Sequence, residues 1–127
     1  MKKLSVIILA IILFNSCEKE THVDYYIDNQ SSGQISVNGS NIIRSTGIDQ
    51  TINPNEKLNV AAWSKYGKQT DLFEPKAVFG NDLVITNSLG DTLTKDYKSL
   101  TNWNADIDNQ RAVANHEYIL IVTDTDF

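Results

Sequence analysis

The chain has 127 residues, a length that suits a single domain. Its 11 Lys and Arg against 16 Asp and Glu give a formal net charge of −5, which argues against a protein that binds nucleic acid by neutralising phosphates. A single cysteine excludes an internal disulfide framework and a metal site made of several cysteines.

Residues 1–16 have the layout of a secretory signal peptide. Lys2 and Lys3 form a positive start, an apolar run follows from Leu4 to Phe14, and small or polar residues come next. The run is shorter than the roughly 20 apolar residues that a membrane-spanning helix needs. We therefore expect residues 1–16 to be removed, and the loss of the two lysines changes the formal charge from −5 to −7.

The four residues Phe14-Asn15-Ser16-Cys17 resemble a lipobox, the site where bacterial lipoprotein signal peptidase cuts before a cysteine. That pattern prefers leucine at its first position and glycine or alanine before the cysteine, so Ser16 matches it well and the two preceding residues match it loosely. The resemblance implies that Cys17 becomes the acylated first residue of the mature protein, which its lipid then holds on a membrane.

Two further features resemble lipoproteins of the Bacteroidota. The charged residues Glu18 to Glu20 are similar to the stretch that follows the lipidated cysteine in surface-exported members, although a solvated tether over residues 17–22 explains them equally well. Thr92, within Asp91-Thr92-Leu93, resembles the acceptor of general O-glycosylation in this phylum. These features imply an outer-membrane location, on the periplasmic or the cell-surface side.

Residues 23–127 predict one all-β domain. Val23, Tyr25 and Ile27 alternate with polar residues, as in a half-buried strand, whereas residues 118–122 are apolar on both faces, as in a central strand. Asn38-Gly39 predicts a hairpin turn. We expect short strands at 23–28, 34–38, 41–44, 48–52, 57–63, 83–87, 92–94 and 118–122.

About seven short strands separated by turns favour a two-sheet antiparallel β-sandwich, immunoglobulin-like or transthyretin-like. The polar residues 68–76 predict a loop, and residues 95–115 predict a longer irregular segment in which a short helix is an alternative. The layout also resembles small Bacteroidota lipoproteins with one β-sandwich and no assigned activity, at Tyr26–Asn29, Ile52–Glu56 and Tyr118–Asp124. These motifs are structural and transfer no functional residue.

Catalytic residues are not indicated. His22 lies near the tether, and His116 could meet Asp124 or Asp126 and a serine, but no Gly-x-Ser-x-Gly elbow or phosphate-binding loop marks a nucleophile. We expect His116 to be a turn residue before the last strand. The many carboxylates could supply a glycosidase pair by accident, so their number does not discriminate.

A calcium site is at most weakly indicated. Asn104, Asp106 and Asp108 place oxygen ligands at alternate positions, but an EF-hand loop would need glycine at Asn109 and glutamate at Asn115. We expect a solvated loop there, no metal and no cofactor, with a looser calcium site as the alternative.

Aromatic residues are the best candidates for contact with a ligand. We expect Trp63 in the core, and Trp103 exposed within the polar irregular segment, accompanied by Tyr97 and Tyr66. The expected function is therefore non-enzymatic binding at the cell envelope, with an envelope protein or a glycan as the partner. A small envelope hydrolase acting on a glycan or ester, and a structural, accessory or immunity-type protein, are the alternatives.

Overall fold

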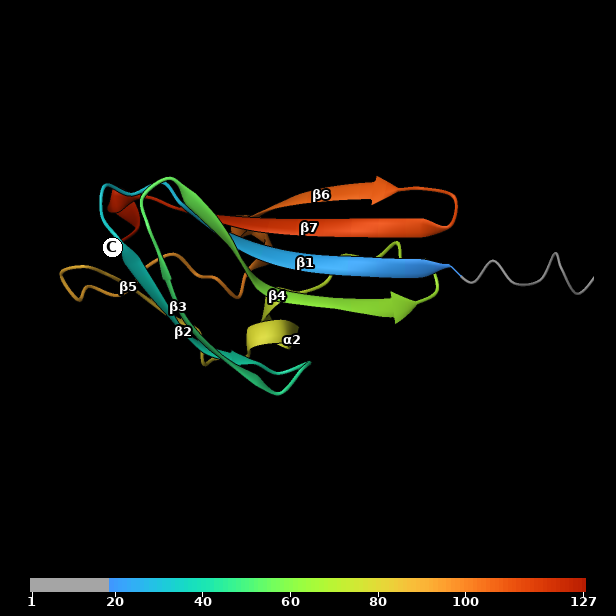
Figure 1. Cartoon of the computed structure of the whole chain (residues 1–127), viewed down its shortest axis with the longest axis horizontal. Coiled ribbons are helices and arrows are strands. Elements are labelled where there is room, and N and C mark those ends of the chain that lie inside the picture. The colour runs from blue at the N-terminus through green and yellow to red at the C-terminus, as the bar shows by residue number, and fades with distance from the viewer. Residues whose placement is uncertain (1–18) are drawn as a thin grey trace, which may run out of the picture.

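The computed structural model describes residues 19–127, so the predicted signal peptide and Cys17 lie outside the described part. Seven strands form two sheets, with the orders β4-β1-β7-β6 and β3-β2-β5, which cross obliquely (Figure 1). The predicted all-β sandwich is confirmed. The strands are β1 (Glu20–Asn29), β2 (Ile35–Asn41), β3 (Thr46–Ile52), β4 (Glu56–Tyr66), β5 (Val84–Asn87), β6 (Trp103–Asn109) and β7 (Val113–Val122). Short helices lie at α2 (Pro75–Phe79), η1 (Leu100–Asn102) and η2 (Asp124–Asp126).

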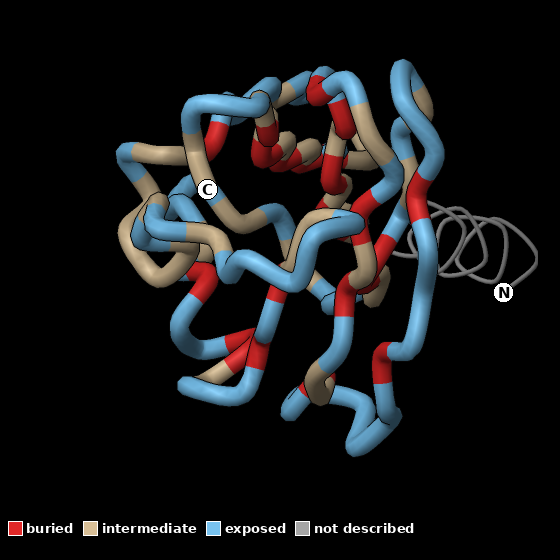
Figure 2. Tube along the Cα trace, turned by 90° about the vertical axis from the view of Figure 1, so that its left-hand side faces the viewer, coloured by how far each residue is buried: buried red, intermediate tan, exposed pale blue. Residues whose placement is uncertain are grey.

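The first and last strands lie side by side in the middle of the larger sheet. β1 and β7 pair in parallel, from Glu20 opposite Val113 to Asn29 opposite Val122, whereas all other strand pairs are antiparallel. Inward and outward residues alternate along β1, as its sequence predicts (Figure 2). β7 is a central strand, which its apolar sequence also predicts.

The core between the sheets is rich in aromatic rings. Tyr25 lies at its centre, stacked on Tyr118 with ring centroids 4.7 Å apart, and the edges of Phe79 and Trp103 contact it. Trp63 stacks on the other side of Tyr25 at 5.7 Å. Among the described residues, the buried members of the core cluster all lie between Val23 and Val122.

The predicted hairpin at Asn38-Gly39 is wrong. β2 continues through Gly39, where a Cβ atom would lie 2.9 Å from the Asp82 carbonyl oxygen, so the glycine permits close packing rather than a turn. The chain turns instead at residues 42–45, which removes most of the strand predicted at 41–44.

The segment 95–115 is more regular than its sequence predicts. It contains η1, the edge strand β6 and the start of β7, and β6 is polar because most of its side chains face solvent. The predicted strand at 92–94 is reduced to one bridge between Thr86 and Thr92, since β5 pairs with β2. The predicted loop at 68–76 ends in α2, whose first residue is Pro75, a favoured position for proline.

β1 begins at Glu20, so the last three residues of the predicted tether belong to the sheet. Within residues 19–127, no helix combines the length and the apolar character required to span a bilayer.

Candidate functional site

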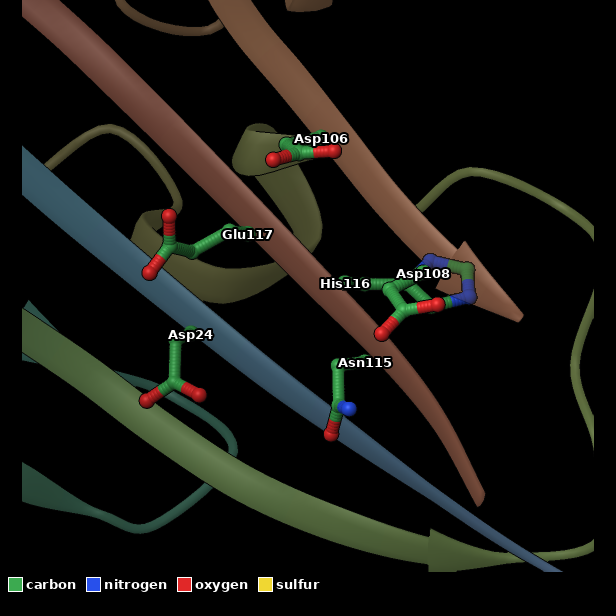
Figure 3. Close-up of a pocket in the computed structure, with 6 residues that line it drawn as sticks. All are labelled: Asp24, Asp106, Asp108, Asn115, His116 and Glu117. Atoms are coloured by element: carbon green, nitrogen blue, oxygen red, sulfur yellow. The ribbon is translucent and has the colours of Figure 1, made fainter. Parts of the chain in front are cut away.

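A row of carboxylates crosses the outer face of the four-stranded sheet. Asp24 on β1 is the register partner of Glu117 on β7, and Glu117 is the partner of Asp106 on β6. Asp108, two residues further along β6, lies opposite Asn115. These five side chains project from one face of three neighbouring strands (Figure 3), and we name this surface the acidic face.

The alternation of the strands explains why these groups point outward. On β1 and β7 the neighbours of the acidic residues are Val23, Tyr25, His116 and Tyr118, which are all buried in the core. The acidic face lines a shallow, open hollow of about 330 Å³. It therefore has the shape of a contact surface and not of an enclosed pocket.

The negative charge of the acidic face is not balanced by nearby cations. In the described part of the chain, the close contacts between basic and acidic side chains are His22 with Glu20 at 3.8 Å, on the same outer sheet face, and Lys95 with Asp126 at 2.9 Å, and neither includes a carboxylate of the acidic face. Asp24 accepts a hydrogen bond from Asn59 at 2.7 Å. Carboxylates directly opposite each other on adjacent strands repel, so this row costs stability unless a cationic group binds to it.

The predicted calcium ligands belong to this surface, but they do not form a metal cage. Asn104, Asp106 and Asp108 lie on strand β6, whereas the sequence predicts a loop. Side chains two positions apart on a strand are separated by about 7 Å along it, too far to close around one ion without further ligands. Across residues 19–127, no three His, Cys, Asp or Glu side chains gather closely enough to hold a metal.

The expectation that Trp103 is exposed is wrong. Its side chain is 4% exposed, and its indole Nε1 donates a hydrogen bond to the Tyr97 carbonyl oxygen at 2.7 Å. Trp103 begins β6 at an inward-facing position and contacts Tyr25 and Phe79. Its polar neighbours in the sequence alternate outward, which is why composition alone misplaces it. Tyr97 is half-buried, and Tyr66 is 79% exposed.

His116 is a buried strand residue and not the turn residue that its sequence position predicts. Its side chain is 1% exposed, with Nδ1 3.2 Å from the Tyr118 hydroxyl and Nε2 3.2 Å from the Gln69 carbonyl oxygen. Because a carbonyl only accepts, the arrangement that satisfies both contacts places the proton on Nε2. Asp124 and Asp126 bind Ser32 and Lys95, so the structure does not bring either carboxylate to His116.

His116 belongs to a polar network that holds the 67–74 loop to the sheet. Tyr25 donates to the Phe73 carbonyl oxygen, and the Phe73 amide donates to the Tyr118 hydroxyl at 2.9 Å. Burial raises the pKa of both hydroxyls above the ordinary value of 10.0, and the Glu74 carboxylate adds to this effect. The sequence signal that could have revealed this network is the presence of side chains with polar groups, Tyr25, His116 and Tyr118, at the inward positions of β1 and β7.

The remaining predicted sites fall in two places. Thr92 is exposed beside the turn that follows β5, which makes its hydroxyl accessible. Cys17 lies outside the described residues.

Comparison of the chain with protein-family models, with curated proteins and with solved structures finds no match.

Proposed function

We propose that the protein is a lipid-anchored lipoprotein of the cell envelope that acts by binding and not by catalysis, with the acidic face as its recognition surface. The observation that carries the proposal is the row of Asp24, Glu117 and Asp106, three carboxylates in register on an open sheet face without an ion pair in the described chain. Such a face complements a basic surface, so we propose an envelope protein with exposed Lys or Arg side chains as the partner.

The position of the histidines supports binding over catalysis. A general base needs a ring nitrogen that can reach the proton it removes. Both ring nitrogens of His116 are occupied by the network around Tyr118, and the ring is closed off from solvent. His22 is near Glu20 on the outer face, and although Ser64 is its register partner on β4, it makes no hydrogen bond to a hydroxyl or thiol among the described side chains. The carboxylates, in contrast, are open to a partner.

The N-terminal sequence supports the anchor. Two lysines, an apolar run and a cysteine follow one another in the order of a lipoprotein signal peptide. β1 begins at Glu20, so two residues separate it from Cys17, and the three Cα–Cα steps reach at most about 11 Å. An acylated Cys17 would therefore hold the domain close to the membrane surface.

Metabolic labelling with palmitate tests the anchor. We expect the wild-type protein to incorporate label and the Cys17→Ala variant to lose it. Labelling that persists in the variant would contradict the lipoprotein assignment.

Affinity capture from the protein's own membranes tests the acidic face. The test variant is Asp24→Asn/Asp106→Asn/Glu117→Gln. The matched control, Asp49→Asn/Asp71→Asn/Glu74→Gln, removes the same number of charges elsewhere. We expect the wild type and the control to retain one protein partner that high salt releases, and the test variant to lose it. Equal capture by both variants would reject the acidic face, and a captured glycan would replace the protein partner.

A further inference from the structure

Three segments meet at the end of the domain where β1 begins. The Gly67 amide donates to the Lys19 carbonyl oxygen at 2.7 Å, and the Glu20 amide donates to the Ala112 carbonyl oxygen at 3.1 Å. The end of β4, the β6–β7 hairpin and the start of β1 therefore form one surface, and the C-terminus lies at the opposite end of the molecule (Figure 1). We name this surface the anchor end.

The anchor end is basic although the protein is acidic, because its cations outnumber its carboxylates, Glu20 at the start of β1 and Asp108 near the end of β6. Four exposed cations belong to its three segments: Lys19, Lys65, Lys68 and Arg111. Only nine of the 11 Lys and Arg follow Cys17, so nearly half of them gather here. None of the four forms an ion pair with any described residue. Their charge is thus available to an anionic surface.

An exposed aromatic ring lies among these cations. Tyr66 ends β4 opposite Glu20 and is 79% exposed, and it is the one aromatic side chain within residues 19–127 that is mostly exposed. Burying such a ring in the protein would have been the ordinary outcome. Tyrosine, with an apolar ring and a polar hydroxyl, is favoured at the boundary between lipid and water.

We propose that the anchor end lies directly against the anionic phospholipid headgroups of the leaflet that holds the lipid anchor, with Tyr66 at the lipid–water boundary. The proposal rests on the proposed function for the position of the anchor at Cys17. A connection of at most about 11 Å keeps the four cations near the headgroups, at a distance comparable to the screening length of about 8 Å at physiological salt. The net negative charge of the domain opposes contact between its other surfaces and anionic lipid, so the domain contacts the membrane through the anchor end.

Lysine footprinting on vesicles tests the orientation. Cys17 is the only thiol, so the chain from residue 17 onward can be coupled through it to a maleimide lipid, whether or not a cell acylates it. A water-soluble amine reagent is then applied on vesicles of phosphatidylcholine alone or mixed with phosphatidylglycerol. On the mixed vesicles we expect Lys65 and Lys68 to react about fivefold more slowly. Lys57 and Lys98 serve as internal controls and should react equally on both.

Two charge-reversal variants of equal net charge complete the test. Lys65→Glu/Lys68→Glu/Arg111→Glu should lose the slower reaction at Lys19, whereas Lys57→Glu/Lys76→Glu/Lys98→Glu should keep it. Circular dichroism of both variants establishes that they are folded. Uniform labelling of all lysines, equal protection on both kinds of vesicle, or protection that survives the first variant would each overturn the proposal. Palmitate labelling is a separate measurement, so a wrong orientation and a wrong anchor give different results.

Discussion

Tyr25 and Tyr118 are register partners on the two central strands, and their hydroxyl groups bind the same residue, Phe73, at its carbonyl oxygen and its amide. Their stacked rings lie in the core, and their hydroxyl groups form hydrogen bonds that connect the sheet to the 67–74 loop. This loop has no strand pairing of its own. The two tyrosines, His116 and Thr21 therefore determine where it lies, since the Thr21 hydroxyl donates to the Gly67 carbonyl oxygen and accepts from the Gln69 amide.

The substitution Tyr118→Phe is expected to lower the free energy of unfolding by about 2 kcal/mol, because it leaves the partly buried Phe73 amide and the buried His116 Nδ1 without their partner. Urea unfolding measures the loss, and faster hydrogen exchange of the Phe73 amide localises it. Tyr26→Phe, on the outer face, is the control and should change stability by less than about 0.5 kcal/mol. A loss equal to that of the control would contradict the role of the network.

Stability is expected to fall in alkaline solution. The folded protein holds the protons of Tyr25 and Tyr118 to higher pH than the unfolded chain, whose tyrosines titrate near 10.0. The stabilisation is therefore complete below that pH and is lost as the pH rises above it, by up to about 1.4 kcal/mol per pH unit for each group. Urea midpoints from pH about 9 to about 11 measure the slope. The stability of the double variant Tyr25→Phe/Tyr118→Phe should fall less steeply with pH.

The C-terminal turn is expected to weaken in acid. Burial opposes ionisation of Asp126, but hydrogen bonds from Lys95 and from the Thr123 amide and hydroxyl outweigh it and hold the pKa of Asp126 below 3.8. The stabilisation is present above that pH and disappears as the pH falls through the lower, folded-state value. We expect Asp126→Asn to cost about 1–2 kcal/mol at neutral pH. In urea titrations the difference should vanish in acid, whereas the control Asp49→Asn should show no such dependence.

Substitution by alanine is expected to lower the free energy of unfolding much more at Trp103 than at Tyr66. Trp103→Ala leaves a cavity beside Tyr25 and Phe79 and should cost about 3–5 kcal/mol in urea unfolding. Tyr66→Ala removes an exposed ring and should change stability by less than about 0.5 kcal/mol. A small effect at Trp103 would contradict its placement in the core.

Neutralising the acidic face is expected to stabilise the domain. Glu117 lies between two carboxylates in register, so Glu117→Gln should raise the free energy of unfolding by about 0.2–1 kcal/mol. Salt screens the same repulsion, so added NaCl should stabilise the wild type more than the variant. Asp49→Asn on the other sheet is the matched control. A variant less stable than the wild type would show that Glu117 makes favourable contacts instead.

Strand patterns with a clear period could be predicted from the sequence, and patterns set by distant partners could not. Val23, Tyr25 and Ile27 alternate because one face of β1 is buried, and this local period is visible in the letters. β6 is a strand because it pairs with β7, and its exposed face is polar, so its own residues predict a loop. At Gly39 a local turn signal was overridden by close packing against Asp82.

The candidate site could be predicted only in its residue types. The oxygen atoms of Asp106 and Asp108 are visible in the sequence, and Glu117 lies across the hairpin that follows them, but Asp24 is distant in sequence. Asp24 joins their row only because β1 pairs with β7 in parallel, which no local pattern encodes. The burial of Trp103 could not be predicted from local sequence either, because its polar neighbours predict exposure whereas its inward position on β6 buries it.

The parallel pairing of β1 with β7 also has a consequence for biosynthesis. β1 leaves the ribosome first and β7 last, so the larger sheet cannot close until the C-terminal strand is made. A chain that stops before Val113 presents β1 with an open edge, on which other extended chains can add. Incomplete chains are therefore prone to aggregation and to proteolysis, whereas full-length chains can complete the larger sheet.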